Sequence, residues 1–264
     1  MNSMDKPVVL ITGAARRVGQ SIAERFAREA YAVVIHYGRS VCQAEKFGAE
    51  LSRAGVEVMV CGADLSDAEA LKKMMEEVYE RFGRLDVIVN CAAVFFPDHL
   101  ADFHLQDLDH AWQVNCRAPL LLTQLFYTKA RRLNQQGVVI NIVDQKVRGN
   151  FHPDDFSYTV SKAALAQLTP MLAVSAAPVL RVNAIYPGLT APSGDQTEED
   201  FYHARLHATP LGYTATSHDI AEACLLLTQA SFNGCDFVVD AGQNLVRVEH
   251  DVIHLYRSPS SQRA

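Results

Sequence analysis

Short, continuous apolar runs alternate with longer segments of helical periodicity, and this alternation constrains the fold more than any other feature of the sequence. The apolar runs cover residues 8–11, 32–37, 56–61, 87–90, 138–143, 180–185 and 237–239. The segments with helical patterns cover residues 19–30, 42–54, 67–82, 108–133, 156–176 and 217–229. Strands that are apolar on both sides must be covered on both faces, which is typical of parallel sheets. We therefore predict an α/β single-domain Rossmann fold, a doubly wound parallel sheet of about seven strands with helices on both faces.

The composition agrees with one large domain. The chain has 264 residues, of which 49% are hydrophobic and 20% are charged, and these values are ordinary for a globular protein with a sizeable core. No linker divides the sequence, so we expect one domain over residues 1–264. Residues 189–211 are expected to form an irregular substrate-binding loop insert, and residues 249–264 a polar C-terminal tail that frays at its end.

Charge and cysteine usage restrict the partners and the location. The net charge of −6 argues against nucleic acid or an anionic membrane as the main partner, and no apolar run reaches the ~18 residues of a transmembrane helix. The six cysteines include no Cys-x-x-Cys pair, so we expect free thiols in a reducing compartment, without disulfides or zinc ligands. Together with an N-terminus that has no signal-peptide pattern, this predicts a cytoplasmic protein. No metal site is expected, and three histidines are interpreted as surface or loop residues: His152, His203 and His207.

Tyr158 and Lys162 are candidates for acid–base chemistry. They are four residues apart in a predicted helix, so both side chains lie on one face of it. An ammonium group beside a phenol favours the phenolate, which predicts a Tyr158 pKa below the usual ~10. The pair would then exchange protons near neutral pH. Surface helices also carry such pairs by chance, so the pattern gains weight only from the rest of the chain.

The end of the first predicted strand resembles a phosphate-binding turn. Small residues between Gly13 and Gly19 lead into a helix, whose N-terminal N–H groups and dipole favour an anion. Only two glycines of the usual three are present, so an ordinary strand-to-helix turn is the alternative. The second strand ends without the acidic residue that holds the ribose of NAD. Arg39 and Ser40, with Arg16 or Arg17 nearby, would instead suit a 2′-phosphate, which predicts NADP(H).

Two further strand ends could contact the cofactor. Residues 63–65 after the third strand could bracket an adenine, and the small residues at 90–92 would let the backbone approach a ribose. Each signal is weak alone, because an aspartate such as Asp64 at a strand end is more often a cap or a turn residue.

Taken together, these segments resemble the short-chain dehydrogenase/reductase family across essentially the whole chain. The resemblance rests on the order and spacing of Thr12-Gly13…Gly19, Asp64, Asn90-Cys91-Ala92, Asn115, Tyr158-x-x-x-Lys162 and Pro187-Gly188. It implies a Rossmann-fold, nicotinamide-dependent oxidoreductase. Three features, together with residues 36–40, are similar to the pteridine reductase branch, and the dihydromonapterin and dihydrofolate reductases of the family share the first two of them. Arg17 stands where the family usually has glycine, Asp144 where it usually has serine, and Phe95 where that branch stacks the pterin.

The resemblance also implies roles for individual residues. The implied catalytic residues are Asp144, Tyr158, Lys162 and Asn115, with Asn115 expected to hold a water or a backbone link behind Lys162. The implied substrate-binding residues are Arg17, Phe95, Asp144, Tyr158 and Leu189. The cofactor-binding residues that position and resemblance predict together are Gly13, Arg16, Arg17, Val18, Gly19, His36, Tyr37, Arg39, Ser40, Ala63, Asp64, Leu65, Asn90, Cys91, Ala92, Tyr158, Lys162, Pro187 and Gly188.

The function implied by the resemblance is NADPH-dependent reduction of dihydropterin- or dihydrofolate-type substrates to their tetrahydro forms, with the proton from Tyr158. One alternative is a carbonyl reductase of the same family, such as a 3-oxoacyl thioester reductase. A second alternative is a non-catalytic NADP-binding regulator, which the loss of Tyr158 or Lys162 would have favoured. A homotetramer is expected, partly from the resemblance and partly because the helices at 108–133 and 156–176 carry more apolar residues than one sheet face needs.

Overall fold

Seven parallel strands form one sheet in the order β3-β2-β1-β4-β5-β6-β7. The protein is represented by a computed structural model, which describes residues 6–192 and 196–255. The strands are β1 (Val8–Ile11), β2 (Ala32–Tyr37), β3 (Val58–Gly62), β4 (Val87–Asn90), β5 (Gly137–Ile142), β6 (Leu180–Pro187) and β7 (Asp236–Val239). The predicted fold class is confirmed: this is a Rossmann-type α/β sheet.

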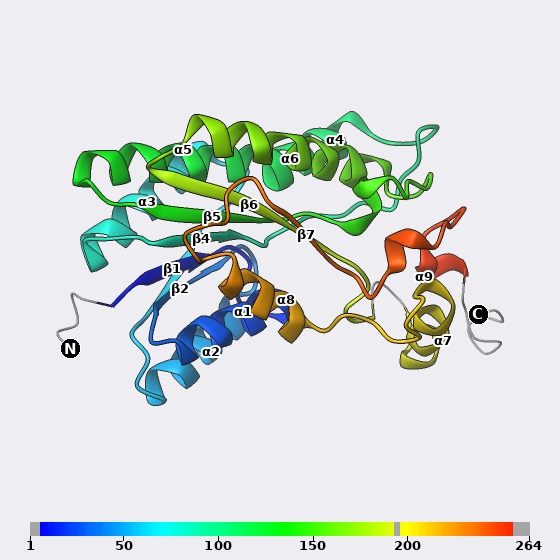
Figure 1. The fold of residues 1–264 in the computed structure, drawn as a ribbon, viewed down its shortest axis with the longest axis horizontal. Coiled ribbons are helices and arrows are strands. Elements are labelled where there is room, and N and C mark those ends of the chain that lie inside the picture. The colour runs from blue at the N-terminus through cyan, green and yellow to red at the C-terminus, as the bar shows by residue number, and fades with distance from the viewer. Residues whose placement is uncertain (1–5, 193–195, 256–264) are drawn as a thin grey trace.

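Helices cover both faces of the sheet, as Figure 1 shows. One layer contains α3 (Ala68–Phe82), α4 (Leu105–Trp112), α5 (Ala118–Leu133) and α6 (Phe156–Ser175). The opposite layer contains α1 (Arg17–Arg28), α2 (Val41–Arg53) and α8 (Ser217–Leu226). Each layer seals an apolar core against the sheet, with Phe126 central to the first and Phe26 to the second. Both rings are fully buried, and each such burial stabilises the fold by ~1.5–3 kcal/mol.

The chain crosses from one half of the sheet to the other at β1. It runs outward from β1 to β3 and then returns to form β4 on the opposite side of β1. Loops that leave β1 and β4 at their carboxyl ends therefore diverge to opposite layers and leave a crevice between them. Ligands of doubly wound sheets bind in such a crevice, so the fold itself predicts the position of the site.

Buried side chains hold the loops at this edge in place. The Thr12 hydroxyl oxygen accepts hydrogen bonds from the N–H groups of Cys91 (3.0 Å) and Ala92 (3.1 Å), which fixes the loop after β4 against the loop after β1. The side chain therefore satisfies two backbone donors that the sheet does not pair.

His36 makes a second tie between the loops. Its Nδ1 atom accepts a hydrogen bond from the Gly13 N–H (3.2 Å), and its Nε2 atom lies 3.0 Å from the Ala63 carbonyl oxygen. The imidazole must therefore carry its proton on Nε2. Burial lowers the His36 pKa, although the bond to Ala63 acts in the opposite direction, so the ring is neutral at neutral pH. Predicted as a cofactor residue, His36 instead uses both ring nitrogens to fix the turn that would hold the cofactor.

The single helix predicted over residues 108–133 is wrong in two respects. The helix begins at Leu105, and a π-helical segment, η2 (Gln113–Arg117), separates α4 from α5. Pro119 in the first turn of α5 explains the interruption, because it has no N–H to donate to the carbonyl four residues earlier. The π segment places Asn115 inside the fold, where its side chain is fully buried.

The segment predicted as an irregular insert contains a helix, α7 (Glu198–Ala208). A capping box starts it: the Thr197 hydroxyl accepts from the Asp200 N–H, and the Asp200 carboxylate accepts from the Thr197 N–H. Residues 193–195 of the insert and 256–264 of the predicted tail lie outside the described residues. The described part of the tail is held by contacts, since the Asp251 N–H donates to Asp154 Oδ2 (2.6 Å) and a short helix, α9 (Val252–Leu255), follows.

Smaller differences concern element ends. The third strand begins two residues later than predicted, at Val58, and α8 ends at Leu226 rather than at residue 229. Among the described helices, none is both long and apolar enough to cross a membrane.

We expect Gly19→Ala to destabilise the protein through the turn before α1. A Cβ atom at position 19 would lie 2.4 Å from the Gly13 carbonyl oxygen and 3.0 Å from Ala14 Cα. Both are backbone atoms, so the turn itself would have to move. We expect the free energy of unfolding to fall by about 1–3 kcal/mol in urea denaturation without cofactor. Gly38→Ala is the matched control, because its Cβ would meet nothing within 4 Å. Equal stability of the two variants would contradict this account of the turn.

Candidate active site

The turn between β1 and α1 has the shape and charge of a phosphate site. Gly13 adopts a φ of 69°, and a Cβ there would lie 3.0 Å from Ala92 Cα, so only glycine fits between the two loops. The first turn of α1 contains no acidic residue, while Arg16 and Arg17 are exposed beside it. Backbone N–H groups, helix dipole and arginines all favour an anion at this point.

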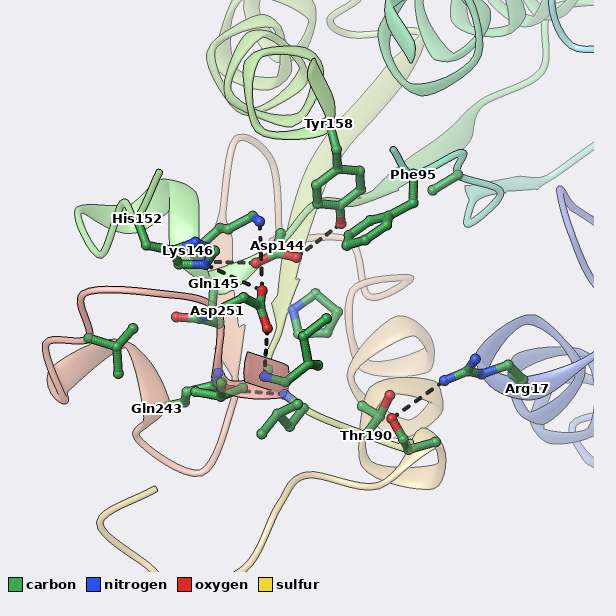
Figure 2. Close-up of a pocket in the computed structure, with 18 residues that line it drawn as sticks. Arg17, Phe95, Asp144, Gln145, Lys146, His152, Tyr158, Thr190, Gln243 and Asp251 are labelled. Carbon is green, nitrogen blue, oxygen red and sulfur yellow. Dashed lines mark hydrogen bonds and ion pairs between the residues drawn. The ribbon is translucent and has the colours of Figure 1, made fainter. Parts of the chain in front are cut away.

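Arg17 occupies the left-handed backbone region with a φ of 54°. A residue with a side chain pays of order 1–2 kcal/mol for that conformation, whereas glycine does not. The backbone therefore keeps the conformation suited to glycine while the side chain extends out of the turn. The guanidinium donates to the carbonyl oxygens of Pro192 (2.9 Å) and Ala191 (3.5 Å). Figure 2 shows Arg17 extending towards this loop. Arg17 thus joins the candidate phosphate site to the loop after β6.

The end of β2 presents groups suited to a second phosphate. Arg39 is exposed just after the strand. Ser40 stands at the N-cap of α2 but makes no side-chain capping bond, so its hydroxyl is not used by the helix. Nearby, Asp64 accepts bonds from the Ser66 N–H (2.8 Å) and hydroxyl (2.7 Å), which lower the Asp64 pKa, with a small contribution from Arg39. Asp64 therefore makes a turn after β3, and its contact with the cofactor stays a prediction.

Asn90 ends β4 in a buried polar chain. Its amide donates to Asn141 Oδ1 (2.8 Å), and the Asn141 amide donates to the Thr169 hydroxyl (3.0 Å). Asn90 Oδ1 is buried and has no hydrogen-bond partner within the described part of the chain. The chain of bonds ties the end of β4 to β5 and α6.

Tyr158 and Asp144 form the centre of the candidate catalytic face. The Tyr158 hydroxyl donates to Asp144 Oδ2 at 2.9 Å, and the other carboxylate oxygen accepts from the Lys146 N–H at 2.9 Å. Asp144 follows β5, and Tyr158 lies in the first turn of α6. Lys162, one turn further along, places its ammonium 5.8 Å from the centre of the Tyr158 ring and donates to the Ile142 carbonyl (2.7 Å).

The predicted lowering of the Tyr158 pKa is wrong for this arrangement. Burial of the phenol raises its pKa well above the usual value, and the charge and hydrogen bond of Asp144 raise it further. Burial also lowers the Lys162 pKa to about 8, partly offset by Asp144. The prediction considered only the lysine and neglected the cost of placing a phenolate beside a carboxylate. Tyr158 is therefore protonated at neutral pH, as a proton donor must be.

Asn115 does not link directly to Lys162. Its Oδ1 atom accepts from the Val94 N–H (2.8 Å), and its amide donates to the Val94 carbonyl (2.9 Å) and the Ser161 hydroxyl (3.0 Å). Asn115 therefore anchors the loop after β4 to α6, at the residue before Lys162.

A cavity of about 250 Å³ opens in front of Tyr158. Phe95 projects over it with 48% of its surface exposed, and its ring centre lies 4.9 Å from that of Tyr158 (Figure 2). The opposite wall begins at Leu189, whose N–H donates to Gln243 Oε1 (2.8 Å). The sequence-predicted residues that the fold brings together here are Arg17, Phe95, Asp144, Tyr158, Pro187, Gly188 and Leu189.

Several lining residues had no signal in the sequence. They include Lys146, His152, Gln243 and Asp251, which reach the cavity through tertiary packing. His152, predicted to be a surface or loop histidine, lies in the loop before α6, where only 3% of its side chain is exposed and it contacts Asp154 and Asp251. Among the described residues, no cluster of three histidine, cysteine or acidic side chains could hold a metal ion.

Comparison with known proteins agrees with this geometry. A short-chain dehydrogenase/reductase model described as "Enoyl-(Acyl carrier protein) reductase" matches residues 13–244. The 3-oxoacyl-[acyl-carrier-protein] reductase FabG of Staphylococcus aureus (strain Mu50) is 30% identical over 83% of this chain and 89% of its own. Two structures of FolM alternative dihydrofolate reductase 1 complexed with NADP are similar. That from Brucella canis has a TM-score of 0.85 and 29% identity over 98% of this chain and 99% of its own. That from Brucella suis has a TM-score of 0.83 and 30% identity over 94% of this chain and 98% of its own. The chain belongs to the short-chain dehydrogenase/reductase family.

Proposed function

We propose that the protein is an NADPH-dependent reductase of pterins, which converts dihydropterin- or dihydrofolate-type substrates to their tetrahydro forms. The observation that carries the proposal is the hydrogen bond from Tyr158 to the Asp144 carboxylate (2.9 Å). A carbonyl reductase must stabilise negative charge that develops on the substrate oxygen. A carboxylate at that position would repel the charge, whereas reduction of a ring C=N bond needs only a proton at nitrogen. The likeness to the two FolM structures supports the same substrate class.

NADP(H) fits the cofactor end of the crevice. The turn after β1 can receive the pyrophosphate, and Arg39 with Ser40 can receive the 2′-phosphate, since no acidic residue occupies residues 36–40. Both FolM neighbours are complexes with NADP. When bound, NADPH supplies the hydride.

The chain's own residues deliver the proton. Tyr158 is protonated because burial and Asp144 raise its pKa, and its hydroxyl is fixed at one side of the cavity. Asp144 orients this hydroxyl and can pass it a new proton from the cavity after transfer. A phenolate left beside a carboxylate is unfavourable, so the arrangement favours rapid reprotonation of Tyr158.

The substrate cavity suits a flat ring. Phe95 presents a half-exposed face above the cavity, and an aromatic face in this position can stack on a heterocycle. Arg17 and Leu189 also line the cavity, and we expect the variable side chain of the pterin ring to extend towards them. The loop insert at 189–211 would then contact the part of the substrate that differs among pterins.

A 3-oxoacyl thioester reductase is the second candidate, favoured by the 30% identity to FabG. The experiment that separates the two is NADPH oxidation with a panel of dihydropterins, dihydrofolate and an acetoacetyl thioester. Turnover of the thioester alone would reject the pterin proposal. Binding of NADPH without turnover of any member would favour the non-catalytic regulator.

We also propose a homotetramer in a reducing, cytoplasmic compartment. Met171 and Val174 leave large apolar side chains exposed on α6, a surface that symmetric packing of a second copy would bury. The described cysteines are free thiols, and Cys61, Cys116 and Cys224 are buried, in agreement with a reducing environment.

We expect Arg39→Asp to remove the preference for NADPH over NADH. The change deletes a phosphate partner and adds a repelling charge, so the ratio of kcat/KM for the two cofactors should fall at least about tenfold, or ~1.4 kcal/mol. Steady-state kinetics with both cofactors checks this. Arg132→Asp, at the far end of α5, is the charge-matched control. An unaltered protein that uses both cofactors equally well would refute the assignment.

We expect Tyr158→Phe to abolish most turnover while NADPH binding stays within about twofold. Loss of a general acid costs on the order of 10²–10⁴ in rate, and the phenol is not the main anchor of the cofactor. Single-turnover rates and a fluorescence titration with NADPH measure the two effects. Tyr127→Phe on α5 provides a control for loss of a hydroxyl. Near-normal turnover in the Tyr158 variant would exclude it as the donor.

We expect Asp144→Ser to lower pterin turnover at least about tenfold, or ~1.4 kcal/mol of transition-state stabilisation. Activity on an activated carbonyl should rise, because a hydroxyl can donate to a developing oxyanion. Asp144→Asn separates charge from shape and should lose pterin turnover without this gain. The measurement is kcat/KM on both substrate classes. Unchanged pterin turnover in Asp144→Ser would move the assignment to the carbonyl alternative.

A further inference from the structure

A second lysine lies against the ring of Tyr158. Lys146 Nζ is 5.1 Å from the ring centre, closer than the 5.8 Å of Lys162 Nζ, and it is also 5.9 Å from the centre of the Phe95 ring. Only 2% of Lys146 is exposed. An ammonium over an aromatic face within about 6 Å is attracted by the ring, more strongly where both are desolvated.

The backbone of Lys146 is fixed by the catalytic carboxylate. Lys146 lies in a short 3₁₀ helix, η3 (Gln145–Arg148), for which Asp144 is the N-cap. Its N–H donates to Asp144 Oδ1 at 2.9 Å, while Asp144 Oδ2 accepts from Tyr158. One carboxylate therefore sets the positions of both the proton donor and the lysine beside it.

Two carboxylates, one fully buried and one mostly buried, neutralise this ammonium. Asp155 Oδ2 lies 3.4 Å from Lys146 Nζ, and Asp251 Oδ2 lies 4.0 Å from it. Burial of an ammonium is costly unless it is paired, so these partners account for its position. Asp155 immediately precedes α6, whereas Asp251 comes from the C-terminal segment, residues 246–255. Figure 2 shows Lys146 and Asp251 meeting at the cavity wall.

The C-terminal segment is held in place by its own set of bonds. The Asp251 N–H donates to Asp154 Oδ2 (2.6 Å), and Asp251 Oδ1 accepts from the Ile253 N–H (3.0 Å). His152 Nε2 lies 3.4 Å from Asp251 Oδ2. Burial raises the Asp251 pKa, but the bonds from His152 and Ile253 and the charge of Lys146 outweigh it, and the net pKa lies below the usual value. Asp251 is therefore an anion at neutral pH.

Opposing charges converge on Tyr158 from every element around it. The negative groups are Asp144 after β5, Asp155 before α6 and Asp251 before α9, and the positive groups are Lys146 in η3 and Lys162 in α6. Behind Lys146 and Asp251, an outer group consists of His152, Asp154, His99 and His250. All three inner carboxylates disfavour the phenolate. Without Lys146, two of them would lose their counter-ion.

We propose that Lys146 is a positioning residue for proton transfer: its ammonium balances Asp155 and Asp251 beside Tyr158 and joins the C-terminal segment to the catalytic pair. The proposal concerns the proton donor and not the substrate, so it stands for a pterin or for a carbonyl compound. The proposal also explains why part of the cavity wall comes from the C-terminal segment: the ion pair with Lys146 holds Asp251 beside the cavity.

The test is a set of charge variants read by the pH dependence of kcat. Reduction needs protonated Tyr158, so the rate falls as pH rises through the Tyr158 pKa. Lys146→Met removes a cation and disfavours the phenolate. The alkaline limb of the profile, where kcat falls with rising pH, should therefore move to higher pH. The kcat on the plateau below it should fall about tenfold, because Tyr158 becomes a weaker acid. Asp251→Asn should move the limb to lower pH. The charge-balanced double variant Lys146→Met/Asp251→Asn should return the limb towards that of the unaltered protein, and Lys146→Arg should stay close to it.

Two controls separate this effect from loss of packing. Lys129→Met removes a lysine that stands 5.3 Å above the ring of Tyr79 on the far side of the protein, and it should leave kcat and its pH profile unchanged. NADPH affinity should change less than about twofold in every variant. The substrate is whichever member of the panel the unaltered protein reduces fastest, so absence of pterin turnover bears on the proposed function and not on Lys146.

Urea denaturation adds a readout that needs no turnover. The double variant should be more stable than Lys146→Met, because it no longer buries Asp251 as an unpaired anion. If Lys146→Met does not fold, the double variant carries the test, with the same expected limb. A Lys146→Met profile that matches the unaltered protein would overturn the proposal. The proposal would also be overturned if the pH profile of the double variant were shifted as far as that of Lys146→Met, or if the double variant were no more stable in urea than Lys146→Met.

Discussion

All seven strands of this protein point the same way, so every loop that can carry chemistry leaves the sheet at one edge. That constraint brings Thr12, Cys91 and Asp144 to the same crevice although they are far apart in the sequence. It also creates a cost, because backbone groups beyond the strand ends have lost their ladder partners. Thr12 satisfies two of them at the β1–β4 boundary, and His36 satisfies a donor and an acceptor between β1 and β3. The site rests on these side-chain bonds as much as on the sheet.

The catalytic face is built from charges that the fold keeps close together despite their repulsion. The Tyr158 hydroxyl donates to Asp144. The negative charges of two further carboxylates, Asp155 and Asp251, also raise the Tyr158 pKa. Such a cluster costs stability unless cations balance it, and Lys146 and Lys162 supply that balance from two different elements. The net result is a phenol that keeps its proton at neutral pH. A serine at position 144 would remove one of the negative charges that keep Tyr158 protonated. It would suit a substrate that develops negative charge on oxygen.

The sequence predicted the fold well and the site in part, for physical reasons that differ between residues. Fully buried parallel strands appear as continuous apolar runs, so their approximate number and parallel arrangement could be predicted. The interruption at Gln113–Arg117 could not, because it depends on how the missing N–H of Pro119 is accommodated within one packed helix. The helix in the insert has a local signal in the capping box of Thr197 and Asp200, although the polar composition of the segment favours a loop. The sign of the Tyr158 pKa shift depends on burial, and Asp251 reaches the cavity from a segment nearly a hundred residues away. Neither the direction of this pKa shift nor the position of Asp251 can be predicted from the spacing of residues in the sequence.

The two halves of the crevice are built from different kinds of contact. The cofactor half depends on close backbone approach, where Gly13 meets Ala92 and only small residues fit. The substrate half depends on side chains: Arg17 binds the loop carbonyls at Ala191 and Pro192, and Lys146 binds Asp251 on the opposite side. Substitution in the first half disturbs the turn and the sheet edge together. Substitution in the second changes charge and shape around the substrate while the sheet remains intact. The departures at Arg17 and Asp144 belong to the second kind, and for that reason they carry more information about the reaction than the rest of the fold does.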